Sequence, residues 1–391
     1  ISIAAVKGYH FTESDDFCGK LCHVVMAPEH TAWSKYPHAR VRCVECHIGP
    51  GAKWYVKAKI SGLKQIYAVL AHTYAIPIET PVVNLRPARD TCERCHWPEK
   101  FYSGRQKVYY HYAPDEKNTP RVINMLINIG GTPKTPTAAG IHWHIGNEVY
   151  YIARDKKRLD IPYVAVKDKN GKIIEYNDED SPLSKEEIAK GEKRLMDCID
   201  CHNRPTHIYR SPGQEMDENF VSGHIDPTLP FIKKVAVELL TEPYKTKEEG
   251  RSAIAGGIEK FYAKNHPKAA GDKAAAIRQA TEMVQDIYDR NFFPKMKVYW
   301  NTYPNHIGHF YTPGCFRCHG GKHKSEDGKV ISKDCDLCHT VLGQIQENIR
   351  QGAKVKGFIH PTDIGDSMIA LNCSECHSAG GEDVPGGGKG K

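Results

Sequence analysis

The fourteen cysteines of this 391-residue chain fall into seven close pairs, and a histidine directly follows each pair. Six pairs have the pattern Cys-x-x-Cys-His, whereas the first has one additional residue between its cysteines. The paired cysteines are Cys18 and Cys22, Cys43 and Cys46, Cys92 and Cys95, Cys198 and Cys201, Cys315 and Cys318, Cys335 and Cys338, and Cys373 and Cys376. The histidines that follow them are His23, His47, His96, His202, His319, His339 and His377.

This spacing is typical of covalent c-type haem attachment. Two cysteines about one helical turn apart can each form a thioether with one vinyl group of the porphyrin, and the next histidine can reach the iron axially. The additional residue of the first motif can bulge out of that turn. The sequence therefore predicts seven covalently bound haem c groups, attached by the fourteen cysteines and ligated by the seven motif histidines.

Zinc sites and disulfides explain the pattern less well. Zinc needs four donors that converge tetrahedrally, which gives no role to a histidine after every second cysteine. Disulfides account for an even number of cysteines in a secreted chain, but again not for the histidines. Because c-type haem is attached outside the cytoplasm, the sequence predicts a periplasmic protein.

The supply of further axial ligands is ample, since 14 of the 21 histidines lie outside the motifs. Two imidazoles on each iron give low-spin haem with no open position, which suits electron transfer rather than catalysis. We therefore predict no catalytic residues. The best-placed distal candidates are His38, His142, His144, His207, His309, His323 and His360.

Two details of this ligand set depend on local geometry. His142 and His144 are expected two apart on a strand, where they serve one iron or two neighbouring irons. Met26 lies three residues after His23 and is a candidate thioether ligand of the first haem. A methionine that only packs beside the haem fits the same spacing equally well.

Composition excludes several classes of protein. The absence of any run of 18 apolar residues argues against a multi-span membrane protein. The net charge of +7 comes without basic blocks interleaved with aromatic residues, so nucleic acid is not an expected partner. The apolar run of residues 1–6 precedes Lys7, and it fits the end of a membrane anchor, the end of a signal peptide or an ordinary N-terminus.

Residue patterns predict strands in one part of the chain and helices in another. Ser184 and Glu187 form a capping box expected to open a helix that delivers Cys198, and Asn170-Gly171 indicates a hairpin turn. Strands are predicted at 108–112, 122–129, 149–153, 163–166 and 172–176. Helices are predicted at 53–70, 229–240, 247–265, 273–291 and 341–351. Loops are expected at 130–136 and in a disordered tail from Gly380.

Three segments resemble the NapC/NirT/NrfH family of membrane-anchored multihaem quinol dehydrogenases. Thr12–Met26 has Phe-Cys before the first motif and a nearby methionine, and Tyr36–Gly49 has a histidine shortly before the second motif. Cys198–His207 reads Cys-Ile-Asp-Cys-His with a second histidine five residues after the first. Gly314–His323 and its surroundings are similar to the C-terminal part of seven-haem NapC-type cytochromes of metal-reducing bacteria.

The resemblance implies that Met26 ligates the first haem, that His38 and His207 are distal ligands, and that Lys59 lies near a haem. The alternative for Lys59 is a solvated helix lysine. It further implies an inner-membrane anchor before the chain and transfer of electrons from the quinol pool, with menaquinol as substrate, to periplasmic cytochromes or reductases in anaerobic respiration. Carboxylates near the first motif are candidate proton acceptors, namely Glu13, Asp15, Asp16 and Glu29.

The expected fold class is a multihaem cytochrome c, mostly α with sparse secondary structure around packed haems, and with a β-rich insertion. The predicted units are a NapC/NirT-like domain with three haems (1–104), the β-rich insertion (105–190), a fourth-haem segment completing the NapC-like module (191–212), a helical segment (213–300), a C-terminal three-haem domain (301–379) and the disordered tail (380–391).

Two other functions remain open at this point. One is a soluble or filament-forming periplasmic or extracellular electron carrier, possible if no anchor precedes the chain. The other is a multihaem reductase of the nitrite or hydroxylamine type, which needs one iron without a strong distal ligand. Enzymatic activity is expected to go no further than quinol dehydrogenation, and assembly into a homo-oligomer or larger complex stays open.

Overall fold

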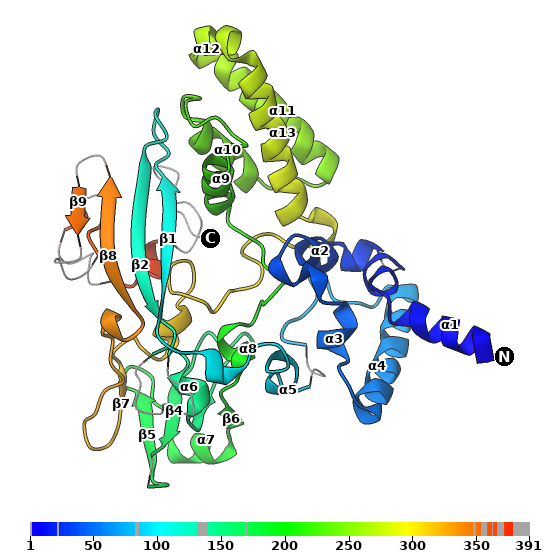
Figure 1. The fold of residues 1–391 in the computed structure, drawn as a ribbon, viewed down its shortest axis with the longest axis vertical. Coiled ribbons are helices and arrows are strands. Elements are labelled where there is room, and N and C mark those ends of the chain that lie inside the picture. The colour runs from blue at the N-terminus through cyan, green and yellow to red at the C-terminus, as the bar shows by residue number, and fades with distance from the viewer. Residues whose placement is uncertain are drawn as a thin grey trace.

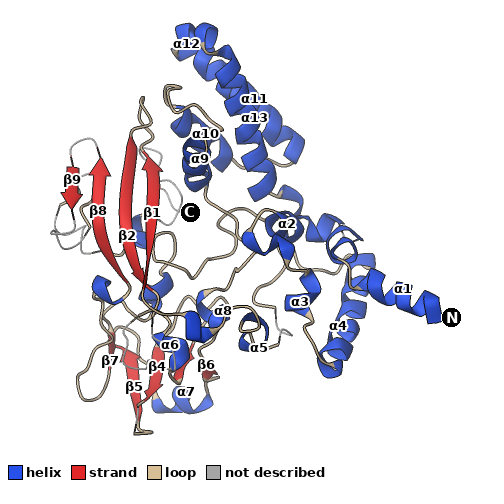
Figure 2. Ribbon diagram, viewed as in Figure 1, coloured by secondary structure: helices blue, strands red, loops and turns tan. Residues whose placement is uncertain are grey.

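The computed structural model describes residues 2–21, 23–82, 86–130, 140–168, 170–346, 349–352, 358–361, 363–365 and 371–377. Helices gather at the N-terminal end and in one separate bundle, and two antiparallel sheets lie on the other side of the molecule (Figures 1 and 2). Cys22, most of the predicted loop at 130–136 and the predicted tail lie outside the described residues.

The N-terminal part consists of short helices joined by irregular chain. The elements are α1 (Ser2–Thr12), η1 (Phe17–Leu21), α2 (His23–Ser34), η2 (Pro37–Arg40), α3 (Cys43–His47), α4 (Ala52–Leu70), α5 (Arg89–Cys92) and η3 (Pro98–Lys100). The predicted helix at 53–70 is confirmed as α4. The segment η1 is a π-helical turn, which accommodates one more residue than an α-turn. It lies where the first motif has its additional residue.

One sheet has the strand order β1-β2-β8-β9, and the other has the order β6-β3-β4-β5-β7. The strands are β1 (Gly104–Tyr112), β2 (Pro120–Asn128), β3 (Val149–Ile152), β4 (Tyr163–Lys167), β5 (Ile173–Asp178), β6 (Arg194–Leu195), β7 (His323–Lys324), β8 (His339–Gln346) and β9 (Ile349–Gly352). All five predicted strands are confirmed. Each sheet also takes strands from beyond residue 300, so the strands of the predicted insertion pair with the C-terminal part.

The predicted helix at 341–351 is wrong, because this segment forms β8 and β9. Val341 pairs with Met125 and Ile345 with Val122, both across the β2–β8 ladder. β-Branched residues such as these pack well on a pleated sheet, and β2 offers an apolar partner that a local pattern does not reveal. Tertiary pairing therefore overrides the helical period.

Two further local predictions need correction. Ser184 and Glu187 do form a capping box, but α7 covers only Lys185–Lys190. The strand β6 follows it, and α8 (Cys198–Cys201) begins separately with Asp197 as its own cap. His142 and Trp143 begin a short helix, α6 (Trp143–Gly146), rather than a strand.

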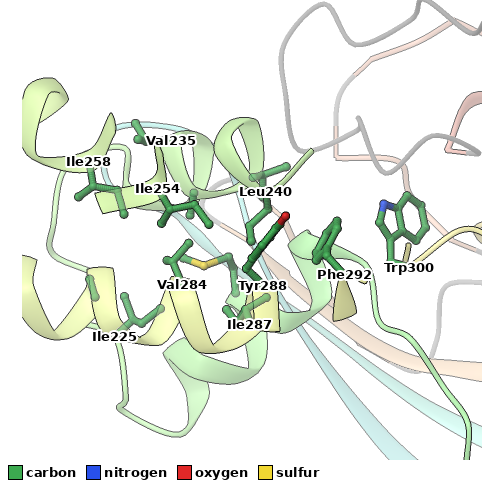
Figure 3. Close-up of a cluster of buried hydrophobic side chains, with 14 of the residues drawn as sticks. Ile225, Val235, Leu240, Ile254, Ile258, Val284, Ile287, Tyr288, Phe292 and Trp300 are labelled. Atoms are coloured by element: carbon green, nitrogen blue, oxygen red, sulfur yellow. The ribbon is translucent and has the colours of Figure 1, made fainter. Parts of the chain in front are cut away.

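A helical bundle without cysteine motifs occupies the middle of the chain. Its helices are α9 (Pro212–Val221), α10 (Ile232–Thr241), α11 (Lys247–Asn265), α12 (Pro267–Asp272) and α13 (Ala274–Asn291), which confirms the predicted helices there. Apolar side chains of α10, α11 and α13 interlock in its core, together with Ile225, Phe292 and Trp300 (Figure 3). Buried Lys233 of α10 donates to Asp217 (2.8 Å) and to the Tyr112 carbonyl (2.6 Å), which ties the bundle to β1.

Two glycines of α11 should respond in opposite directions to alanine. A Cβ at Gly250 would lie 2.4 Å from the Tyr288 ring of α13, whereas a Cβ at Gly256 would meet nothing within 4 Å. We expect Gly250→Ala to lower the free energy of unfolding by about 1–3 kcal/mol through overpacking. Gly256→Ala should raise it by about 0.5–1 kcal/mol, because alanine restricts the unfolded chain. Denaturant unfolding followed by circular dichroism measures both, and equal effects of the two variants would contradict this packing.

Candidate haem sites

The six motifs whose cysteines are all described each form about one helical turn. The first cysteine of each motif lies in a short helical element. These elements are α3, α5, α8, η5 (Gly314–Arg317), η6 (Cys335–Leu337) and α15 (Cys373–Cys376). In the third, fourth, fifth and seventh motifs the histidine N–H donates to the carbonyl of the first cysteine, for example from His202 to Cys198 at 2.8 Å. This backbone turn brings the two cysteines and the histidine of one motif together, as thioether attachment requires.

One large cavity joins these motifs. Its volume is about 4180 Å³, and described cysteines of all seven motifs line it, beginning with Cys18. A site for one small molecule usually measures about 300–1,000 Å³. The cavity thus has the size and the donor set for several large planar groups, and it fits the haems that the motifs imply.

Six motif histidines face a second imidazole across this cavity. Two metal–nitrogen bonds of about 2 Å, with about 1 Å from each nitrogen to its ring centre, would separate two axial imidazoles by about 6 Å. The observed centroid distances are 6.0 Å for His38 and His96, 6.2 Å for His47 and His207, 6.5 Å for His142 and His202, 5.6 Å for His144 and His319, 6.1 Å for His309 and His339, and 6.2 Å for His360 and His377.

Backbone carbonyls orient several of these rings. The Nδ1–H groups donate to carbonyls from His38 to Pro205 (3.0 Å), His207 to Glu29 (3.0 Å), His142 to Ile129 (2.6 Å), His144 to Ile141 (2.8 Å) and His319 to Ser332 (2.8 Å). Such a bond fixes the tautomer and leaves the Nε2 lone pair directed away from the carbonyl, as in protein metal sites.

Burial also favours the neutral, ligating form of the rings. Desolvation, together with the nearby His207, lowers the pKa of His47 to about 4. Burial likewise lowers the pKa of further members of the pairs, namely His142, His144, His202, His207, His309, His319 and His339. Neutral imidazole is the form that binds a metal.

His323 has a different environment from the paired candidates. Its Nε2 donates to the Ile161 carbonyl at 2.7 Å, no ring contact joins it to a motif histidine among the described residues, and its ligand role stays a prediction. His142 and His144 face two different motif histidines, which is the second of the two arrangements expected for them. Met26 lies on α2 three residues after His23 and lines the cavity, so its ligand role stays a prediction.

Local sequence patterns did not indicate the charged cluster around Asp200 in the fourth motif. Asp200, inside this motif, is 2% exposed and accepts hydrogen bonds from Arg158 (2.7 Å), Arg194 (2.8 Å) and the Tyr151 hydroxyl (2.7 Å). His306 is also buried, and its Nδ1 donates to the Asp200 carbonyl at 3.1 Å. From the sequence, only the position of Asp200 between two motif cysteines could be noted. Its partners could not be predicted, because they come from separate segments of the chain.

Comparison with known proteins agrees with this geometry. Residues 309–385, which contain the last three motifs, match the family model of cytochrome c3. The chain is 69% identical over 392 residues to the cytochrome c-type protein ImcH of Geobacter sulfurreducens, a match that covers all of this chain and 77% of the relative. The chain belongs to the ImcH family of c-type cytochromes. No solved structure matches it.

In this ImcH-family cytochrome, the first four motifs contact one another in chain order. The Cys18 and Cys43 thiols lie close enough for Cys43 to lower the pKa of Cys18, and Cys198 lowers the pKa of Cys92 in the same way. Between the second and third motifs, Arg94 and Glu45 form an ion pair of 3.4 Å.

The same order continues to the seventh motif. Arg317 of the fifth motif donates to the Asp200 carbonyl of the fourth at 2.9 Å. Phe316 of the fifth motif stacks on His309, the ring that faces His339 of the sixth, with centroids 4.3 Å apart. The adjacent Phe310 stacks on His377 of the seventh motif at 4.5 Å. The ImcH-family chain therefore holds its motifs as one connected series.

No described helix of this ImcH-family chain is long and apolar enough to cross a membrane. A periplasmic location is consistent with a c-type cytochrome.

Proposed function

We propose that this ImcH-family cytochrome carries seven haem c groups and transfers electrons from membrane quinol to periplasmic cytochromes or reductases in anaerobic respiration. The six imidazole pairs are the observation that carries the proposal. Haem iron with two strong axial ligands exchanges single electrons without binding a substrate. The role of the polypeptide in this transfer is to hold consecutive haem-attachment motifs in contact, from the first to the seventh.

The proposed axial pairs are those that face each other at about 6 Å, with Met26 as the ligand supplied from α2 to the first motif. Under this assignment none of the six paired sites has an open position. That disfavours a reductase of the nitrite or hydroxylamine type at those sites. A soluble or filament-forming carrier would use the same pairs but would not accept electrons from quinol.

We propose that quinol is oxidised at the first motif, because the chain resembles the NapC/NirT/NrfH family there. Quinol oxidation releases two electrons and two protons, so a proton acceptor must lie nearby. All four candidate carboxylates have structural partners: Asp15 accepts from the Cys43 N–H, Asp16 pairs with Lys20, Glu29 pairs with Arg204, and Glu13 pairs with Lys59. Of the four, Glu13 is the one whose partner is a lysine that lines the cavity. We propose that menaquinol is oxidised beside the pair of Glu13 and Lys59, and that the protein works at the inner membrane.

Substitution of Met26 tests both the ligand and the donor. Because a thioether favours ferrous iron more than an imidazole does, Met26→His should lower the potential of one haem and slow reduction by a soluble menaquinol analogue. The other six haems should keep their potentials. Redox titration and stopped-flow absorbance of the haem-loaded chain measure these effects.

Met26→Leu is the matched control, because leucine packs much as methionine does but cannot bind iron. It should change the spectrum of one haem. If neither variant alters a spectrum or the quinol-driven rate, Met26 is a packing residue. If the unaltered protein is not reduced by the quinol analogue at all, the chain is a carrier rather than a quinol dehydrogenase.

A further inference from the structure

Five large apolar side chains of helix α4 form one exposed face of the helix. Val56, Ile60, Leu63, Tyr67 and Leu70, here called the outer stripe, are spaced by three or four residues and share one helix face. They are 54–76% exposed, and the helix has no buried residue. A solvated helix usually shows the opposite arrangement, with polar residues outward.

The opposite face of α4 lines the cavity. Trp54, Ala58, Ser61, Gly62, Ile66 and Val69 line it, as does Leu63 of the outer stripe, whereas Val56, Ile60, Tyr67 and Leu70 do not. Haem-sized groups in the cavity would therefore cover the inner face and leave most of the outer stripe uncovered. A group other than haem must therefore cover the exposed apolar side chains of the outer stripe.

Charge indicates what that group is. Helix α4 contains four lysines and no acidic residue, and α1 contains Lys7 and no acidic residue. Of the α4 lysines, Lys59 pairs with Glu13, while Lys53, Lys57 and Lys64 lie along one flank of the outer stripe. Protein interfaces are depleted in lysine, whereas helices that lie on membranes combine an apolar face with basic residues that reach the headgroups.

Helix α1 extends the same surface. Its Ile3, Val6 and Phe11 are exposed, and the Tyr9 ring lies 5.8 Å from the Tyr55 ring of α4. Figure 1 shows both helices at one end of the molecule, away from the two sheets. We propose that α4, with α1 beside it, lies in the interface of an anionic phospholipid bilayer. The outer stripe then contacts the acyl region and the lysines contact the headgroups.

This orientation has a consequence that rests on the proposed function. Lys59 of α4 pairs with Glu13, which lies five residues before Cys18 of the first motif. A membrane-bound α4 therefore holds the first motif at the bilayer surface, where a lipid-soluble quinol is available. The membrane contact itself does not depend on quinol as the electron donor.

Vesicle flotation of the oxidised, haem-loaded chain tests the inference without any quinol. We expect it to bind vesicles of phosphatidylcholine and phosphatidylglycerol more tightly than vesicles of phosphatidylcholine alone. Ile60→Asp should weaken binding at least tenfold. The combined Lys53→Gln, Lys57→Gln and Lys64→Gln variant should weaken binding to the anionic vesicles by a similar factor and remove its dependence on salt.

Ile173→Asp is the matched control, since Ile173 is 58% exposed on β5 of the second sheet. It should bind vesicles as the unaltered chain does. Haem absorbance and circular dichroism establish that each variant is folded. The inference is overturned if Ile60→Asp binds as well as the control, if the unaltered chain does not bind anionic vesicles, or if Ile60→Asp only dissociates a dimer seen by sedimentation. None of these results bears on reduction by quinol, which is measured separately.

Discussion

Replacement of Asp200 by alanine is expected to lower the free energy of unfolding by about 2–3 kcal/mol, because it leaves two partly exposed guanidinium groups without their buried counter-ion. Asp200 Oδ1 accepts from Arg158 and Arg194, and Oδ2 accepts from the Asp197 N–H at 2.8 Å. The same side chain therefore neutralises charge and caps the turn that carries Cys198 and Cys201. We also expect a fraction of the protein to lack the fourth haem.

Denaturant unfolding measures the first effect, and intact-protein mass measures the number of attached haems. Asp336→Ala is the matched control, since Asp336 also lies between the cysteines of a motif but is exposed. That variant should change the free energy of unfolding by no more than about 0.5 kcal/mol. Equal stability and equal haem content of the two variants would show that the Asp200 cluster is not structurally important.

Local patterns predicted most of the elements of this fold. The Asn170-Gly171 turn, the helix at 247–265 and the capping box at Ser184 depend on residues close in the chain, and the structure contains all three. The segment 341–351 failed because its conformation depends on β2, a strand about 200 residues earlier in the sequence. The extent of α7 failed for a related reason, since pairing of β6 with β3 ends any continuation toward Cys198.

The haem sites likewise combine features that depend on local sequence with features that depend on the whole fold. Attachment motifs are local, so their cysteines and histidines could be identified from spacing alone. The pairing of histidines is not local: His207 faces His47 and His360 faces His377 because the whole fold brings their segments together. Proximity to a motif in sequence therefore selected candidates without assigning partners, and it also selected His323, which hydrogen-bonds within the β-rich region instead.

Replacement of His144 by methionine should raise the potential of the fifth-motif haem by on the order of 100 mV, because a thioether replaces one of two imidazoles. The His144 and His319 Nε2 atoms lie 3.4 Å apart, and Nδ1 of each ring donates to a carbonyl, so both Nε2 atoms are directed at one point. One of the seven haems should change in a redox titration, with a new sulfur-to-iron charge-transfer band in the oxidised spectrum.

His323→Gln provides the comparison that separates ligation from proximity. His323 lies only four residues after His319 in sequence, but its Nε2 bonds to the Ile161 carbonyl, and a glutamine amide can donate to the same acceptor. This variant should leave all haem potentials within the error of the titration. If His323→Gln rather than His144→Met shifts one haem, then the ring that follows the motif in sequence is the ligand, and the pairing across the cavity is wrong at this site. If both shift the same haem, only one of the two residues can be its ligand, since one iron has a single distal position, and absence of the sulfur-to-iron band in His144→Met would exclude His144.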